Sequence, residues 1–125
     1  PLYWSSYEYP KATGRTPPVA GRKVTLTEGE TESAEGIYVI PTLGRSPGQS
    51  AVSVNTEKGN YMIVGDLMFL RENLEEDKEH GWPFTPPGRF CNILEIWSSI
   101  ELVKERADFV VMTHDPYHLG TEILP

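Results

Sequence analysis

Two apolar runs, each followed by an ionisable side chain, constrain the fold of this chain more than any other feature. Tyr61–Val64 leads to Asp66, and Phe109–Met112 leads to His114. Short apolar runs rich in β-branched residues predict buried strands, and sites are commonly built where strands end at the edge of a sheet. A carboxylate and an imidazole are also two of the side chains that bind zinc. The sequence therefore predicts a site at Asp66 and His114, although the rest of a zinc ligand set is not evident.

The composition argues against several classes of protein. The chain has 125 residues, which suits one domain or a part of one, and a formal net charge of −7. An acidic chain without a basic cluster argues against nucleic acid and anionic membranes as partners. No apolar run approaches the ~20 residues of a transmembrane helix. The single cysteine, Cys91, excludes an internal disulfide and favours a cytoplasmic protein. The start at Pro1 is neither an initiator methionine nor a signal peptide, so we expect a cut or processed end.

Hydrophobic periodicity predicts a sheet and one long helix. The predicted strands are Lys23–Thr27, Gly36–Thr42, Ser50–Thr56, Tyr61–Val64 and Phe109–Met112. Arg89–Arg106 is the predicted helix, because its apolar residues recur near every 3.6 positions and form one face. Glu28–Glu35 is predicted to be an acidic turn, and Glu57–Asn60 a hairpin turn. Several antiparallel strands followed by a helix and a strand indicate the α+β class or a layered α/β fold.

Residues 1–22 differ from the rest of the chain. Proline, glycine, tyrosine and serine dominate this stretch, and no helical period is present. We expect an extended arm there, with residues 23–125 forming the folded unit. The aromatic side chains of the arm would be costly to expose, so the arm is predicted to pack on a partner surface.

Six segments carry a resemblance to a known family. In chain order they are Gly36–Ser50 (GIYVIPTLGRSPGQS), Ile63–Asp66 (a strand that ends in Gly-Asp), Asn73–Glu75 (NLE), Pro86–Gly88 (PPG), Ser99–Ala107 (part of the predicted helix) and His114–Pro116 (HDP). In this order they resemble the C-terminal half of metallo-β-lactamase-fold hydrolases, and most closely the lactonase and cyclic-amide hydrolase subgroup. The resemblance covers roughly residues 23–120. Together the segments are specific, whereas each alone is weak.

The resemblance implies half of a four-layer αββα sandwich, with the site along one edge of the two sheets. It also implies that Asp66 and His114 bind a metal together with a His-x-His-x-Asp-His motif in the N-terminal half. This chain lacks that motif, because its histidines are His80, His114 and His118. We therefore expect a separate or cleaved N-terminal half that carries the motif. The sequence leaves open whether the protein also forms a higher homo-oligomer.

The activity that the resemblance implies is metal-dependent hydrolysis of a small molecule. A metal lowers the pKa of a bound water, and the hydroxide attacks the carbonyl of a cyclic amide, a lactone or a related ester. Zinc is the expected metal, with manganese and iron as alternatives because a carboxylate is present. The family's central histidine falls on Arg45, which has no lone pair for a metal. One metal rather than two is therefore expected, with Asp66 and Arg45 catalytic and Arg45 holding the substrate or stabilising its oxyanion.

Five further residues are candidates for the site. Phe69 stands where lactonases carry a tyrosine and would contact the substrate. Trp82 and Phe84 would do so from the mouth of the pocket. Asp115 would orient its loop or a histidine, and His118 would lie beside the metal ligands.

Other interpretations of the same residues stay open. Instead of binding a metal, Asp66 would only form the turn at the end of its strand. His114 would be a histidine that is hydrogen-bonded within its loop. The Arg45 and Phe69 departures would then mark a decayed metal site in a non-catalytic binding or structural subunit. The metal content of the protein distinguishes the two interpretations, because one tightly held metal per pair of halves favours the enzyme. Cys91 is expected to be a buried, inert thiol rather than a nucleophile.

Overall fold

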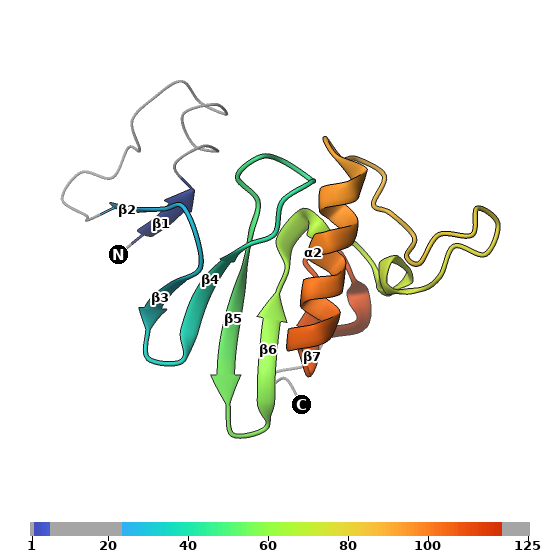
Figure 1. Cartoon of the computed structure of the whole chain (residues 1–125). Coiled ribbons are helices and arrows are strands. Elements are labelled where there is room, and N and C mark those ends of the chain that lie inside the picture. Colours follow the sequence, from blue (N-terminus) through green and yellow to red (C-terminus); the bar gives the residue numbers. More distant parts are fainter. Residues whose placement is uncertain (1, 6–23, 119–125) are drawn as a thin grey trace.

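The computed structural model describes residues 2–5 and 24–118, and its main element is a five-stranded sheet with helix α2 on one face (Figure 1). The strands of this sheet lie in the order β3-β4-β5-β6-β7. The bounds are β3 Thr31–Ala34, β4 Ile37–Pro41, β5 Ser50–Thr56, β6 Gly59–Ile63, β7 Phe109–Val111 and α2 Ile93–Arg106. Three short 3₁₀ helices are η1 Gly65–Leu67, η2 Arg71–Leu74 and η3 Pro116–His118. A two-stranded parallel sheet pairs β1 (Leu2–Ser5) with β2 (Val24–Thr27).

The pairing of β6 with β7 decides where the candidate site lies. Strands β3 to β6 form an antiparallel meander, whereas β7 follows α2 and pairs parallel to β6, with Ile63 opposite Val111. The carboxyl ends of parallel neighbours meet at the same edge of a sheet. Asp66 and His114 follow these two ends, so the fold brings them together although 48 positions separate them.

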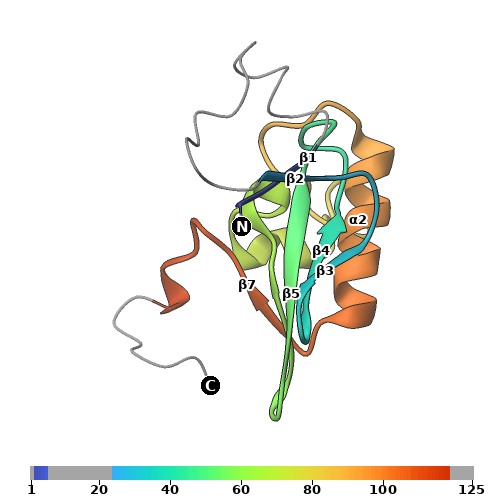
Figure 2. The same cartoon turned by 90° about the vertical axis from the view of Figure 1, so that its left-hand side faces the viewer.

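One face of the sheet packs against α2 and forms the core. Ala51 and Met62 of the sheet and Ile96 and Ile100 of the helix are fully buried and belong to one apolar cluster. Figure 2 shows α2 running along this face of the sheet. The helix begins after Asn92, whose side-chain oxygen accepts hydrogen bonds from two backbone N–H groups of the first turn, at 3.1 and 3.4 Å.

The opposite face of the sheet is apolar as well. Residues directly opposite each other in neighbouring strands share a face. The strand register places one set of apolar side chains on the face away from α2, namely Ile37, Val39, Val52, Val54, Tyr61, Ile63, Phe109 and Val111. Ile63 is 41% exposed. A sheet with two apolar faces is typical of one that is packed between two layers, which is what half of a sandwich requires.

The structure corrects two of the predicted elements. Strand β3 lies within Glu28–Glu35, where the sequence predicts a turn. Its side chains alternate between half-buried and exposed and include no large apolar residue, so the strand is defined by backbone pairing with β4 rather than by hydrophobic alternation. The helix begins at Ile93 rather than at Arg89, because Asn92 is extended, with φ −146° and ψ 112°. The mixed α+β class is confirmed.

Part of the predicted N-terminal arm falls within the described residues. Leu2–Ser5 is the strand β1, paired in parallel with β2. Residues 1 and 6–23 lie outside the described residues, so packing of the arm on a partner stays a prediction. In the part of the chain that the structure describes, no helix is both long enough and apolar enough to cross a membrane.

Candidate active site

Asp66 lies just beyond the carboxyl end of β6, where hydrogen bonds fix the backbone on two sides. The N–H of Val64 donates to the carbonyl oxygen of Val111 at 3.1 Å, and the side-chain amide of Gln49 donates to the carbonyl oxygen of Val64 at 3.2 Å. Gly65 then turns the chain with φ +55°, a conformation open to glycine without strain. The turn places Asp66 in η1, just beyond the end of β6.

Asp66 contacts both other residues of the predicted site. Its Oδ1 lies 3.1 Å from Nε2 of His114, and its Oδ2 lies 3.6 Å from the Nη2 atom of Arg45. The exposed fractions are 26% for Arg45, 44% for Asp66 and 57% for His114. The structure therefore brings the three residues into one accessible cluster that a small molecule can reach.

A cavity of about 570 Å³ opens at this cluster. Its walls combine charged and apolar residues, namely Arg45, Asp66, Phe69, Leu70, Gly88, Arg89 and His114. The Phe69 ring meets the His114 ring edge to face, with centroids 4.9 Å apart, and so restricts the imidazole. The volume is in the range of small-molecule sites. Phe69 thus lines the cavity, and its contact with a substrate stays a prediction.

Arg45 is positioned by the docking of its loop on the start of α2. The carbonyl oxygen of Gly44 accepts hydrogen bonds from the N–H groups of Cys91 and Asn92, at 2.7 and 3.1 Å. The hydroxyl of Ser99 donates to the Leu43 carbonyl oxygen at 2.8 Å. Cys91 contributes only its backbone N–H to this docking, and its side chain is exposed rather than buried as predicted.

The donor atoms of Asp66 and His114 suit a shared metal ion. Two ligands at zinc–oxygen and zinc–nitrogen distances of 2.0–2.1 Å with a tetrahedral angle are about 3.3 Å apart, and these two donors are 3.1 Å apart. Within residues 2–5 and 24–118, no group of three or more His, Cys, Asp or Glu side chains could hold a metal. The described residues thus offer half of a zinc ligand set.

Asp115 fixes the loop that carries His114 rather than contacting the cluster. Its carboxylate accepts hydrogen bonds from the N–H of Arg71 at 3.1 Å and from the N–H of Tyr117 at 2.8 Å. It therefore ties the loop after β7 to the start of η2. The backbone of His118 ends η3, but its side chain lies outside what the structure describes. Its place beside the ligands stays a prediction.

Trp82 and Phe84 are not among the residues that line the cavity. Phe84 is 5% exposed and belongs to the core. Trp82 stacks on His80, with ring centroids 4.9 Å apart. The side chain of His80 in turn lies 2.9 Å from the Asp77 carboxylate, a hydrogen bond that lowers the pKa of Asp77 below its ordinary value. The Asp77–Trp82 loop is thus internally bonded, and contact of either aromatic residue with a substrate stays a prediction.

Asn73 is a positioning residue to which the sequence patterns assigned no role. It is buried, and its side-chain oxygen accepts hydrogen bonds from the N–H groups of Phe69 and Leu70 at 2.8 and 3.0 Å. Its amide nitrogen donates to the carbonyl oxygen of Thr85 at 2.9 Å. The known tendency of asparagine to bond nearby backbone is the signal that could have indicated this role.

Replacing Asn73 by alanine is expected to destabilise the protein by about 2 kcal/mol, because it leaves the part-buried backbone N–H groups of Phe69 and Leu70 without their acceptor. Urea unfolding of the purified protein measures the change. Asn73→Asp is a second variant for comparison: it keeps the acceptor oxygen for the N–H groups of Phe69 and Leu70, but it places a carboxylate oxygen against the carbonyl oxygen of Thr85 in place of a donor. Equal stability of the alanine variant and the wild type would contradict this role for Asn73.

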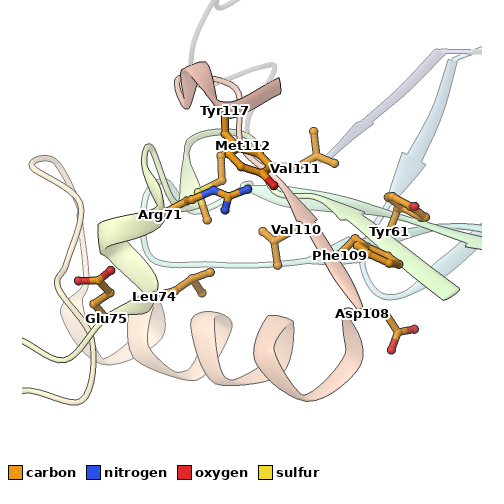
Figure 3. A pocket seen from close by; sticks show the side chains of 10 residues that line it. All are labelled: Tyr61, Arg71, Leu74, Glu75, Asp108, Phe109, Val110, Val111, Met112 and Tyr117. Carbon is orange, nitrogen blue, oxygen red and sulfur yellow. The ribbon is translucent and has the colours of Figure 1, made fainter. Parts of the chain in front are cut away.

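A second cavity, of about 500 Å³, lies along β7 (Figure 3). Val110 and Leu74 face its interior, and Arg71 and Tyr117 stand at one end. The Arg71 guanidinium lies 3.1 Å from the centroid of the Tyr117 ring, and its Nε lies 3.5 Å from the Asp115 carboxylate. The cation of this cavity, Arg71, is therefore already engaged by a ring and a carboxylate.

No protein-family model matches this chain. It is 26% identical over 91 residues to the N-acyl homoserine lactonase AiiA of Bacillus thuringiensis subsp. kurstaki, which corresponds to 72% of this chain and 35% of that enzyme. The chain therefore spans about a third of the length of the curated relatives it matches.

Solved structures give the same result. An N-acyl homoserine lactone hydrolase, with the product N-hexanoyl-L-homoserine at its catalytic metal center, matches with a TM-score of 0.54 and 26% identity, over 74% of this chain and 36% of that one. A quorum-quenching N-acyl homoserine lactone lactonase matches with a TM-score of 0.58 and 24% identity, over 81% of this chain and 41% of that one, and shows the fold alone.

The chain resembles the C-terminal portion of metallo-β-lactamase-fold lactonases. Its five-stranded, mostly antiparallel sheet with one helix is consistent with half of that fold, as the resemblance implied.

Proposed function

We propose that this chain is the C-terminal portion of a metal-dependent hydrolase that opens a lactone, a cyclic amide or a related ester. The observation that carries the proposal is the pair Asp66 and His114, whose donor atoms lie 3.1 Å apart at one edge of the sheet, beside a cavity of about 570 Å³. The similarity of the chain to N-acyl homoserine lactonases supports lactone hydrolysis as the first reaction to test.

Each residue at the cluster has its own role in the proposed reaction. Asp66 Oδ1 and His114 Nε2 would hold the metal, and a bound divalent metal supplies an activated water and polarises a carbonyl oxygen. Phe69 restrains the His114 ring by its edge contact at 4.9 Å. Asp115 holds the loop that follows, because it accepts the hydrogen bonds from Arg71 and Tyr117.

The position of Arg45 is the reason why we propose one metal ion rather than two. Its guanidinium lies 3.6 Å from Asp66 Oδ2, so the oxygen that could bridge to a second cation already faces a fixed positive charge. The same guanidinium lies at the wall of the cavity, where it can donate to a carbonyl oxygen as negative charge develops. Zinc is the metal we propose, with manganese or iron as alternatives.

The remaining ligands would come from an N-terminal half that carries the His-x-His-x-Asp-His motif. Two features of this chain support such a partner. The described residues supply no third ligand to the cluster, and the sheet face opposite α2 is apolar, as a face packed on a second sheet would be.

A test is metal analysis and a ring-opening assay on the protein purified together with any chain that accompanies it. We expect about one zinc, manganese or iron per complex, hydrolysis of a simple lactone or cyclic amide, and a polypeptide that carries the motif in the intact-mass spectrum. Protein that holds no metal and opens no ring, as purified and after incubation with each of these metals, would contradict the proposal.

A second candidate function is a non-catalytic binding or structural subunit. It is favoured by one observation: both Asp66 oxygens have partners in this chain, His114 and Arg45, so the cluster is satisfied by itself. Metal content decides between the two candidates, because a decayed site would hold none.

A further inference from the structure

Two arginines lie at the wall of the same cavity in a chain whose net charge is −7. Arg45 is paired with Asp66 at 3.6 Å. Arg89 is exposed, and among the described residues no carboxylate lies within ion-pairing distance of it. Among the described residues, the wall of the cavity therefore has two guanidinium groups, from Arg45 and Arg89, and one carboxylate, from Asp66.

The backbone at Arg89 is held close to that at Arg45. Cys91, two positions further on, donates its N–H to the carbonyl oxygen of Gly44, the residue before Arg45, at 2.7 Å. On the other side of Arg89, Pro87 is fully buried and anchors the segment. Both arginines thus project from backbone segments that are bonded to each other, which favours a fixed arrangement of the two charges.

The two arginines are not equivalent in what they can bind. Arg45 already has Asp66 as a partner and lies beside the proposed metal ligands, so its charge is used at the reacting carbonyl. Among the described residues, the Arg89 guanidinium has no carboxylate partner. A guanidinium binds a carboxylate through two parallel hydrogen bonds. Phe69 and Leu70 provide an apolar wall in the same cavity, which suits a carbon ring.

We infer that the substrates of this site carry a carboxylate, which Arg89 binds while the ring carbonyl lies at Asp66, His114 and Arg45. The substrate class is thus a small cyclic amide or lactone with a carboxylate on the ring. This inference rests on the proposed function, and it names a specificity residue within the proposed site. Arg89 is a substrate-binding residue here and takes no part in activating water.

The test compares matched ring pairs in the purified, metal-loaded complex. The pairs are γ-butyrolactone with its 5-carboxylate, and 2-pyrrolidinone with 5-oxoproline. Arg89→Gln is expected to raise KM for the carboxylate member of a pair by about tenfold or more and to leave the neutral member within about twofold. Arg106→Gln is the matched control, because Arg106 pairs with Glu30 on the surface at 2.8 Å and should change neither.

A binding measurement separates failure of this inference from failure of the proposed function. Glutarate and glutaramide are titrated into the same complex, and NMR shifts give both affinities. We expect glutarate to bind about tenfold more weakly to the Arg89→Gln variant than to the wild type, and glutaramide to be unaffected. If glutarate binds more weakly to the variant but no ring is opened, the proposed function is contradicted and the role of Arg89 is not. Equal glutarate affinity in the two proteins, or no binding to the wild type, would overturn the role of Arg89.

Discussion

Replacing Asp66 by asparagine is expected to abolish ring opening, with a loss of at least about 10³-fold in kcat/KM, because a metal is worth several kcal/mol in the transition state. The change keeps the size of the side chain and removes its charge. The amide is a poor metal ligand beside the imidazole, and Arg45, 3.6 Å away, loses its counter-charge. Metal content should fall together with activity.

Two measurements check this prediction on the purified complex: metal content after dialysis, and the rate of lactone hydrolysis. Asp108→Asn is the matched control. Asp108 also flanks β7, but at its other end, where the carboxylate accepts a hydrogen bond from the N–H of Asn60 at 2.8 Å. An Asp66→Asn protein that retained its metal and its activity would show that the cluster is not the catalytic centre.

Replacing Gly44 by alanine is expected to destabilise the protein by about 3 kcal/mol, the sum of an unfavourable backbone conformation and overpacking. Gly44 has φ +113°, and a Cβ there would lie 2.4 Å from the backbone nitrogen of Ile96 and 2.9 Å from the carbonyl oxygen of Asn92. Both neighbours are backbone at the start of α2, so neither can rotate away. The loop of Arg45 would have to separate from the helix.

Urea unfolding of the complex measures the cost, and two other glycines separate its causes. Gly81→Ala changes a residue with φ +67° and nothing within 4 Å of the new Cβ, so it reports the conformational cost alone. Gly29→Ala has neither a positive φ nor a close neighbour, and should change stability little. If Gly44→Ala cost no more than Gly81→Ala, close packing of this loop on α2 would not be what positions Arg45.

The local patterns predicted the elements that bury apolar side chains. Ser50–Thr56 is β5 with the bounds expected, because alternating burial leaves a period of two in the sequence. β3 gave no such signal, since an edge strand formed by backbone pairing needs no apolar side chains. Trp82 and Phe84 show that local patterns are equally limited in predicting which residues line the site. The sequence predicts both at the mouth of the pocket, whereas Phe84 belongs to the core.

The sequence by itself determined that Asp66 and His114 each follow a strand, because runs of apolar, β-branched residues specify strands locally. The tertiary structure alone decided that the two residues meet. Their contact at 3.1 Å depends on β7 pairing in parallel with β6 after a crossover through α2. Likewise, Arg45 reaches Asp66 because Gly44 packs against the start of α2. Such contacts join segments far apart in the chain, and the free energy that selects them comes from packing of the whole sheet and helix, so no local pattern encodes them.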